Sequence, residues 1–235
     1  MRVVVAVALD DEWAPWRRRH RFTWITDAIA ETTVGTTVVR VCAVGVGAVQ
    51  LAGLSDLLTE RDVVLACGLS GSLRSDCARG TIVVSRQVRS PGIPSAIASD
   101  PRLVAAALDC GARAVDTLLS VPGIIRTAAD KRARAADADV VDMESFAVLR
   151  DATERGLRVV AIRAIGDAVD DDVPIDFSRA LRRNGSIDYL ALAGHVATRP
   201  VAWPAILRFT RRQRSAIRSL TTFLDRFVAT LDESF

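Results

Sequence analysis

The chain has 235 residues, half of them apolar and a quarter charged, a balance typical of a folded globular protein and not of a disordered one. No apolar run reaches the roughly 18 uncharged residues that a membrane-spanning helix needs. The formal net charge is only +3, which gives poor support for nucleic-acid binding, because that function usually comes with a clustered basic surface.

The first predicted element is a buried strand over residues 2–9. The three acids at residues 10–12 follow at once, where the cleavage site of a signal peptide would need small neutral residues. We therefore expect a cytoplasmic protein. Three consecutive acids repel one another, which favours either a solvated helix N-terminus or a functional role. They also argue against a phosphate cradle at this position.

Short β-branched runs and helical patterns alternate over the next 150 residues, which predicts an α/β protein. Several of these runs are continuously apolar, as expected for strands covered by helices on both faces. We predict a three-layer α/β/α fold around a central mixed, mostly parallel sheet. The predicted strands are residues 33–44 (with Gly35 as a hairpin turn), 62–66, 80–84, 117–121, 140–143 and 158–165. The predicted helices are residues 48–58, 101–108, 128–136 and 144–155.

Two glycine-containing segments follow predicted strands. Gly45-Val46-Gly47 carries only part of a dinucleotide-binding pattern, so tight packing of a strand on a helix explains it better than a cofactor does. The segment around Ser70 and Gly71 allows the backbone to approach a ligand closely, although a plain turn explains it equally well. The four cysteines are widely spaced and the two histidines stand apart from them. We therefore expect reduced, mostly buried thiols, no metal site and no cofactor.

Two later strands each end in a carboxylate, and this is the strongest functional signal in the sequence. Glu144 follows the strand at residues 140–143, and Asp167 follows the strand at residues 158–165. If these strands are parallel neighbours, the two acids lie side by side at one edge of the sheet. Buried acids are costly unless they are paired or used. An ion pair with Arg163 is the alternative, and it accounts for only one of the two acids.

The C-terminal segment differs from the body in charge and pattern. Residues 178–235 carry ten arginines against four acids, a net charge of +6, which leaves −3 for the rest of the chain. We expect a catalytic domain over residues 1–198 and a basic amphipathic helical extension over residues 199–235. Apolar residues at helical spacing predict that residues 217–231 dock on the body. For residues 203–214, docking on the body and contact with an anionic membrane surface are equally supported.

Taken in order, these segments resemble the 5′-methylthioadenosine/S-adenosylhomocysteine nucleosidases and their relatives in the nucleoside phosphorylase superfamily. In that family a D/E-M-E motif follows one strand and an R-A-x-S/G-D motif follows the next, matching residues 142–144 and 163–167 here. The chain most resembles the hopanoid-associated branch, which removes adenine from adenosylhopane. That branch shares the D-M-E-S-F-A-V-L-R wording, an acidic stretch like residues 170–177 and a basic, apolar C-terminal extension.

The resemblance implies three catalytic residues. Asp167 would be a protonated general acid that gives its proton to N7 of adenine. Glu144 would bind the ribose hydroxyls and stabilise the positive charge that develops on the sugar. Glu12 would orient and deprotonate the attacking water. The residues implied to bind substrate or to shape its pocket are Ser70, Gly71, Ile125, Met143, Arg163 and Gly45.

Two positions depart from the family pattern. Gly166 stands where a serine commonly precedes the catalytic aspartate, which removes one hydrogen bond near the acid or the base. Ile124 stands where the methylthioadenosine enzymes carry an aromatic residue that stacks on adenine. The segment at residues 86–99 is also shorter and poorer in aromatic residues than the loop that usually crosses between subunits. These departures favour a pocket open to a bulky, apolar 5′ group.

The leading hypothesis is cleavage of the N-glycosidic bond of an adenosine with a hydrophobic 5′ substituent, as in adenosylhopane during hopanoid biosynthesis. The alternatives within the class are a 5′-methylthioadenosine/S-adenosylhomocysteine nucleosidase and a purine nucleoside phosphorylase that uses phosphate in place of water. Other classes are a dinucleotide-binding oxidoreductase and a non-catalytic nucleoside-binding protein. The expected partners are a small nucleoside, which is lipid-linked in the leading hypothesis, and a second copy of the chain, because relatives are commonly dimers. Membrane contact would place the protein at the inner face of the membrane.

Overall fold

The computed structural model describes residues 2–234, with the side chains of residues 178 and 232–234 left out of the description. The strands are β1 (Arg2–Val7), β2 (Thr23–Thr26), β3 (Ile29–Val34), β4 (Thr37–Ala43), β5 (Asp62–Ser72), β6 (Ile82–Ser90), β7 (Ile93–Ala98), β8 (Arg113–Ser120), β9 (Val140–Asp142) and β10 (Arg158–Asp167). The α-helices are α1 (Asp10–Arg19), α2 (Leu51–Ser55), α3 (Pro101–Asp109), α4 (Ala128–Ala133), α5 (Ser145–Glu154), α6 (Tyr189–Ala197) and α7 (Trp203–Ser234). Three short 3-10 helices are η1 (Val46–Ala48), η2 (Phe177–Ala180) and η3 (Pro200–Ala202).

The strands of the described chain form one mixed sheet. Its order is β10-β6-β8-β9-β5-β1-β4-β3-β2, with β7 paired to β6. Strands β4, β1, β5 and β10 run parallel through the centre. Because β10 pairs with both β5 and β6, the strands β5, β10, β6, β8 and β9 also close into a ring. The carboxyl ends of the central parallel strands therefore lie at one edge, where ligands gather in α/β proteins.

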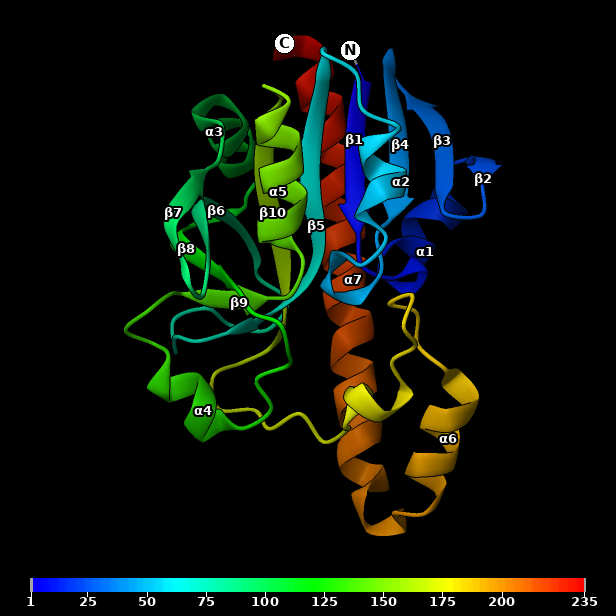
Figure 1. Ribbon diagram of the computed structural model, residues 1–235, viewed down its shortest axis with the longest axis vertical. Helices are drawn as coiled ribbons and strands as arrows, with labels where there is room; N and C mark the ends of the chain where they lie inside the picture. The colour runs from blue at the N-terminus through cyan, green and yellow to red at the C-terminus, as the bar shows by residue number, and fades with distance from the viewer. Residues whose placement is uncertain (1, 235) are drawn as a thin grey trace.

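Helices cover both faces of this sheet, as Figure 1 shows. One apolar cluster joins α1, α3 and α7 to the sheet through side chains such as Trp13, Leu103 and Phe227. A second cluster joins α2 and α5 to the opposite face through side chains such as Leu54 and Phe146. The predicted three-layer α/β/α fold with a central mixed sheet is confirmed.

Most predicted strands are present, with shifted ends. The hairpin at Gly35 joins β3 to β4, and Gly35 has the positive φ of 61° that such a turn favours. Strand β5 runs on to Ser72, beyond the predicted end at residue 66, although Gly68 and Gly71 interrupt its apolar pattern. Strands β2 and β7 were not predicted, because neither buries a run of apolar side chains that would give an alternating pattern.

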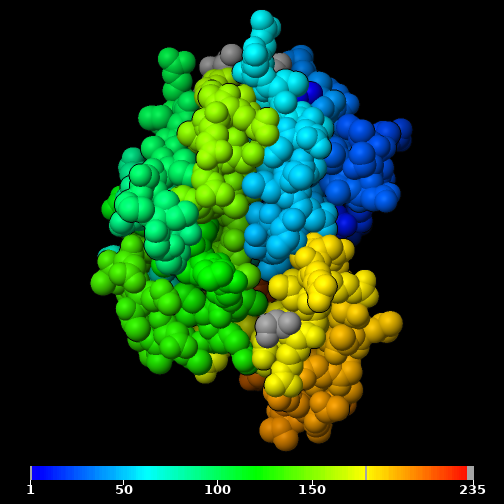
Figure 2. All heavy atoms as spheres, in the orientation of Figure 1, coloured from blue at the N-terminus to red at the C-terminus, as the bar shows by residue number. Residues whose placement is uncertain are grey.

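The C-terminal helix α7 is continuous over 32 residues. Its second half lies in the core, as predicted for residues 217–231, with buried side chains that include Leu220, Phe223, Phe227 and Leu231. Its first half projects from the body beside α6 (Figures 1 and 2). Within residues 2–234, no helix is both long and apolar enough to cross a membrane.

The expected adjacency of the two acid-bearing strands is wrong. Strand β9 is not a neighbour of β10, because β5 lies between them and pairs antiparallel with β9 and parallel with β10. Gly71 of β5 is the shared point, since it is opposite Val141 on one side and Asp167 on the other. The two acids still reach the same edge of the sheet, on either side of β5.

The four cysteines are buried free thiols, as the sequence predicts. Burial raises the pKa of Cys67 to about 12, so its thiol stays protonated near neutral pH.

Candidate active site

A cavity of about 1440 Å³ opens at the carboxyl ends of the central strands. Seven of the nine predicted site residues line it: Glu12, Ser70, Gly71, Ile125, Met143, Glu144 and Asp167. They come from segments more than 150 residues apart in the chain, after β1, β5, β8, β9 and β10. The structure thus gathers most of the predicted residues around one space larger than a typical small-molecule pocket.

Glu12 is held by backbone groups at the start of α1. Its Oε2 accepts hydrogen bonds from the amides of Ala8, at 2.9 Å, and Leu9, at 3.2 Å. Its Oε1 accepts one from the amide of Leu69 in β5, at 2.9 Å. The side chain is 9% exposed, and burial raises the pKa of Glu12, while Arg163 and the three amides oppose the rise. Of the acids at residues 10–12, only this one is buried.

Its two neighbours tie α1 to other elements. Asp10 accepts a hydrogen bond from the indole of Trp13, at 3.1 Å. Asp11 accepts one from the hydroxyl of Tyr189 in α6, at 2.5 Å. The solvated-terminus and functional interpretations of this acidic run therefore apply to different residues of it.

Glu144 is buried where β9 passes into α5. Its Oε1 accepts a hydrogen bond from the amide of Gly47, at 3.0 Å. Burial, reinforced by the charge of Asp142, raises the pKa of Glu144 to about 8, although Arg163 opposes the rise. The nearest guanidinium nitrogen of Arg163 is 3.9 Å from Glu144 Oε2. Glu144 lines the cavity, and within the described residues no hydrogen bond is made to its Oε2.

Arg163 lies beneath these acids and is 1% exposed. It forms an ion pair with Asp142 and donates hydrogen bonds to the hydroxyl of Ser145, at 2.8 Å, and to the carbonyl of Cys67, at 3.3 Å. Its main partner is thus Asp142, and neither Glu144 nor Asp167 is neutralised by it at short range. One guanidinium stands near three carboxyl groups, those of Glu12, Asp142 and Glu144.

Gly68 leaves room for the Arg163 guanidinium and the Glu12 carboxylate to lie close to the backbone of β5. A Cβ at this position would lie 2.6 Å from Nη1 of Arg163 and 2.7 Å from Oε1 of Glu12. Its φ of +149° also lies outside the range that other residues favour. A larger residue at position 68 would therefore displace Arg163 or Glu12.

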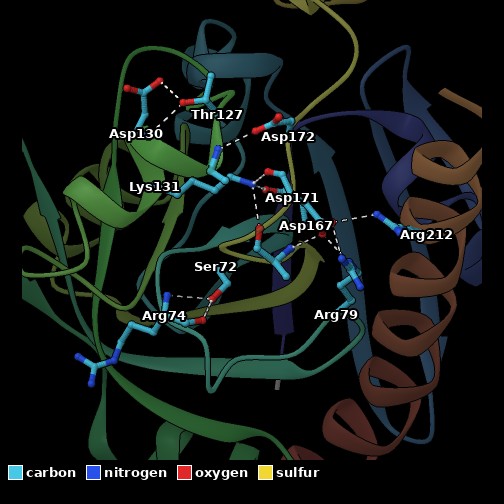
Figure 3. A network of polar contacts seen from close by, with 12 residues as sticks. Ser72, Arg74, Arg79, Thr127, Asp130, Lys131, Asp167, Asp171, Asp172 and Arg212 are labelled. Carbon is cyan, nitrogen blue, oxygen red and sulfur yellow. Dashed lines mark hydrogen bonds and ion pairs between the residues drawn. The ribbon is translucent and has the colours of Figure 1, made fainter. Parts of the chain in front are cut away.

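Asp167 ends β10 on the other side of Gly71. Its carboxylate pairs with the ammonium of Lys131 from α4, as Figure 3 shows. Burial raises the pKa of Asp167, and the charge and hydrogen bond of Lys131 oppose that rise. A Cβ on Gly71 would lie 3.0 Å from Asp167 Oδ2, so a larger residue there would crowd the acid. Nearby, the hydroxyl of Ser70 is buried and has no hydrogen-bond partner among the described residues.

Two predicted site residues do not line the cavity within the described chain. Arg163 supports the cluster from below, as described. Gly45 packs against the turn at residues 184–185, where a Cβ would meet the carbonyl of Asn184 at 2.9 Å and Gly185 at 3.2 Å. Gly45 therefore does not line this cavity, and its positive φ of 74° serves tight packing against that turn. Gly47 is the residue of that segment that touches the site, through Glu144.

The acidic stretch at residues 170–177 fastens the loop after β10 to the surrounding elements. Asp171 pairs with Arg79 and with Arg212 of α7, the latter at 2.9 Å. Asp172 accepts a hydrogen bond from the amide of Ala128 at the start of α4, at 2.8 Å. These contacts hold α4, and with it Lys131, against Asp167 (Figure 3).

Sequence reasoning missed three contributors to the cavity region. Lys131 belongs to no motif, and its only signal is that it is the single lysine in the chain. Gln213 of α7 occupies the space in which a Cβ at Gly166 would fall, so the missing serine is replaced in volume by a side chain from a distant helix. Phe177 and Phe209 both line the cavity, with ring centroids 6.1 Å apart, and supply aromatic surface that Ile124 lacks.

The arrangement places a carboxyl group of raised pKa and a cluster of charged groups at one cavity. Asp167, with a raised pKa and a cationic partner, is suited to protonate a leaving group. Glu12 and Glu144 are suited to stabilise positive charge and to orient a nucleophile. Two carboxyl-bearing sites around one scissile bond are the usual equipment for cleaving a glycosidic linkage.

Comparisons with known proteins agree with this geometry. The family described as the phosphorylase superfamily matches residues 3–187. The chain is similar to the 5′-methylthioadenosine/S-adenosylhomocysteine nucleosidase of Shewanella halifaxensis (strain HAW-EB4), with 26% identity over 181 residues, which is 64% of this chain and 74% of the relative.

Two solved structures share the fold over almost all of this chain. The S-adenosylhomocysteine nucleosidase of Streptococcus pyogenes, in complex with 5-methylthiotubericidin, gives a TM-score of 0.72 at 16% identity, covering 98% of this chain and 97% of the other. A futalosine hydrolase mutant of Helicobacter pylori strain 26695 gives a TM-score of 0.69 at 14% identity, covering 99% of both chains. At such low identity these two likenesses speak for the fold alone.

Proposed function

The chain belongs to the phosphorylase superfamily and is an enzyme of the nucleosidase type, and from this premise we propose that it hydrolyses the N-glycosidic bond of an adenosine-type nucleoside. The observation that carries the proposal is the meeting of Glu12, Glu144 and Asp167 around one cavity. The name of the Shewanella relative makes 5′-methylthioadenosine and S-adenosylhomocysteine the first substrates to test.

In this proposal the residues divide the work by position. Asp167 protonates the departing base, and burial raises the pKa of Asp167 toward the range that suits a general acid. Glu144 faces the sugar and stabilises the oxocarbenium-like charge that develops as the bond breaks. Glu12, fixed by three backbone amides, orients and deprotonates the attacking water. Met143, Ser70, Gly71 and Ile125 bound the nucleoside pocket.

The charge around Glu12 favours water over phosphate as the nucleophile. Phosphate needs cationic or N–H donors that are free to bind it. Arg163 already serves Asp142, Ser145 and the carbonyl of Cys67, and the amides around Glu12 serve its own carboxylate. An anion there would also face the carboxyl groups of Glu12 and Glu144.

The cavity supports a bulky, apolar 5′ substituent. Its lining also includes the apolar residues Pro15, Leu181, Ile187, Leu192 and Phe209. A methylthio group would leave much of that apolar wall in contact with water, whereas a long hydrocarbon would cover it. An adenosylhopane-like nucleoside is therefore the extension of the substrate class that we propose.

The test is adenine release from adenosine, 5′-methylthioadenosine, S-adenosylhomocysteine and a 5′-alkyl adenosine, with and without phosphate. We expect phosphate-independent release, and a rate that rises with the length of an apolar 5′ group. Asp167→Asn should lower kcat by about 10²–10⁴-fold, the usual contribution of a general acid. Asp170→Asn is the matched control, because Asp170 is 67% exposed and forms its ion pair with the exposed Arg132. Wild-type turnover in Asp167→Asn would contradict the assignment.

We also propose that the projection formed by α6, η3 and the start of α7 contacts an anionic lipid surface. The projection exposes Leu190, Val201 and Leu207, which are 86%, 94% and 58% exposed. Arg199 and Arg208, which are close to Val201 and Leu207 in the sequence, are also exposed. Exposed apolar side chains with arginines near them suit the headgroup region of an anionic bilayer.

Vesicle co-sedimentation tests this proposal with the full chain, because a deletion of α7 would remove core side chains such as Phe227. We expect binding to anionic vesicles that is lost in the Leu190→Ser/Val201→Ser/Leu207→Ser variant. Leu108→Ser, which alters an exposed apolar residue on α3, should bind like the wild type. Equal sedimentation of the wild type and the triple variant would reject lipid contact.

A further inference from the structure

The chain contains one lysine among its 31 basic residues, and the other 30 are arginines. That lysine, Lys131, has a side chain with no exposed surface. Burying an ammonium is costly unless it is paired and fully hydrogen-bonded. Lysine also differs from arginine in one chemical respect, because its ammonium can give up a proton and a guanidinium cannot.

The ammonium of Lys131 has an acceptor for each of its three protons. It pairs with the carboxylate of Asp167 and donates to the carbonyls of Ala168, at 3.1 Å, and Asp171, at 2.8 Å. Lys131 itself does not line the cavity that the described residues enclose, whereas Asp167 does. Lys131 thus contacts Asp167 without lining the cavity itself, and Figure 3 shows the two side chains pointing toward one another.

The other charged groups around the pair are engaged with one another. Asp171 pairs with Arg79 and Arg212 and accepts a hydrogen bond from the amide of Ala168, at 2.8 Å. Arg79 and Asp171 also act on Asp167 through their charges, in opposite directions. Among the described residues, Lys131 is the only cationic side chain in direct contact with the carboxylate of Asp167.

We propose that Lys131 is a positioning residue that resupplies, through Asp167, the proton delivered to the leaving base. The inference rests on the proposed function. Before cleavage, the pair holds one labile proton, as ammonium and carboxylate. As the C–N bond breaks, its electrons pass to the base, Lys131 gives a proton to the carboxylate of Asp167, and the resulting carboxylic acid gives a proton to the base. The base leaves neutral, Lys131 is left as an amine, and the positive charge resides on the sugar.

Attack of water on the sugar then releases one proton, which Glu12 accepts. After the products leave, Glu12 gives its proton to water, and Asp167, which lines the cavity, takes up one proton and passes it to Lys131, which restores the ammonium. The cycle therefore balances without any co-reactant. A proton source in contact with the acid also explains why the buried cation here is a lysine in a chain that otherwise uses arginine.

The pH profile separates this role from simple charge pairing. If the pair is the proton source, wild-type activity persists above the pH at which Asp167 alone would have lost its proton. Removing the amine leaves Asp167 as the only carrier, so the alkaline limb of kcat/KM should move to lower pH. If Lys131 merely holds the carboxylate, removing its charge raises the pKa of Asp167, and the limb should move to higher pH.

The experiment compares kcat/KM from pH 5 to 10 in wild type, Lys131→Met and the matched control Arg132→Met. Arg132 is on the same helix, but it is 59% exposed and pairs with exposed Asp170. We expect Lys131→Met to retain activity near pH 5 and to lose roughly tenfold per pH unit above its shifted limb. Arg132→Met should follow the wild type. A limb that stays in place or moves upward in Lys131→Met would overturn the proposal.

Two further variants guard against a structural effect. Lys131→Gln keeps N–H donors toward Asp167, and it should show the same downward shift if Lys131→Met is unstable. Lys131→Arg keeps the charge but cannot release a proton, so restoration of the wild-type alkaline limb by arginine would overturn the proposal. Thermal melts confirm that each variant is folded. If the wild type releases no adenine from any nucleoside, the proposed function fails first, whereas a profile that fails to shift in an active enzyme rejects only the role of Lys131.

Discussion

The buried cluster beneath the cavity has more negative groups than positive ones. Glu12, Asp142 and Glu144 surround the single guanidinium of Arg163, and Asp142 takes its closest contact. A buried acid with a role in the cavity usually lowers the stability of the fold, because neighbouring groups compensate its charge only in part. Glu144 is the residue at which that cost should be measurable.

Glu144→Gln should change how stability depends on pH. The folded protein raises the pKa of Glu144 to about 8, so the native state holds its proton more tightly than the unfolded chain does. The stabilisation from that proton is complete below about pH 4.5 and is lost as the pH rises through about 8. Glutamine has no such proton to lose. Thermal melts from pH 4.5 to 9 should show the variant gaining stability relative to wild type as the pH rises.

The matched control is Glu154→Gln at the exposed end of α5, where the side chain is 70% exposed. Its melting temperature should follow the wild type at every pH. A constant difference between wild type and Glu144→Gln across the range would contradict the shifted pKa.

Residue-level prediction from the sequence succeeded where chemistry follows a strand end. Glu144 and Asp167 were identified because apolar runs stop at them, and both line the cavity. Lys131 could not be found in this way, because it lies in a short polar helix and meets Asp167 across 36 positions of sequence. A pairing of that kind depends on where the loop after β10 folds back.

At the scale of elements, α7 contacts β10 directly before Asp167, at Gly166. Gln213 stands against Gly166, so the residue before Asp167 and the last helix share one volume. The sequence of β10 or of α7 alone does not show that Gln213 fills the space beside Gly166. This contact links the orientation of the C-terminal helix to the strand end that carries the acid.

Gly166→Ser should perturb the site only while Gln213 is present. The new side chain would overlap the Gln213 carboxamide, which must then turn away from β10. We expect a loss of activity of about tenfold in Gly166→Ser and recovery in Gly166→Ser/Gln213→Ala, a coupling of about 1 kcal/mol or more in a double-mutant cycle. Steady-state kinetics of the four proteins measures it.

Gly194→Ser in α6 is the matched glycine substitution, since a Cβ there meets no atom within 4 Å. It should leave activity unchanged. Additive effects of the changes at 166 and 213 would show that the two positions do not share a volume.

Strands and helices with many buried apolar side chains were easier to predict from the sequence than exposed ones. The buried central strands and α5 follow from apolar runs and from the glycine at residue 156, whose φ of 74° suits the end of a helix. The exposed strand β2 gives no periodic signal. The length of β5 was underestimated because its glycines were interpreted as a turn, whereas they make room for Arg163, Glu12 and Asp167.

At the scale of the whole molecule, α7 is the last helix in the sequence, and its second half is part of the core. Phe227 on its second half is fully buried against the sheet, whereas Leu207 on its first half is 58% exposed. The helix therefore serves the fold at one end and the projection at the other. Composition alone could not divide it, since basic and apolar residues run along its entire length.

Phe227→Ala should lower the free energy of unfolding by about 3–5 kcal/mol, as expected for truncating a fully buried aromatic residue. Leu207→Ala on the same helix should change it by less than about 0.5 kcal/mol. Urea denaturation measures both. A similar, small loss in the two variants would mean that α7 is not integral to the core.

The layered α/β architecture was predictable because strand and helix periods alternate along the chain. The strand order was not. Strand β9 is three residues long and lies beside β5, and no local pattern encodes such a long-range pairing. The correct edge of the sheet was nevertheless inferred, although β9 runs antiparallel to β5, because the three-residue strand β9 pairs with the carboxyl end of β5 and so ends close to Asp167.

The burial of Lys131 has a practical consequence for chemical labelling. Acylating reagents attack neutral amines, and the chain has a single ε-amine, which is buried in contact with Asp167. Acylation at residue 131 can occur only when α4 and the loop after β10 separate. The extent of acylation of the peptide that carries Lys131, measured by mass spectrometry, would thus report local opening of this region. Adding a ligand would show whether binding reduces that opening.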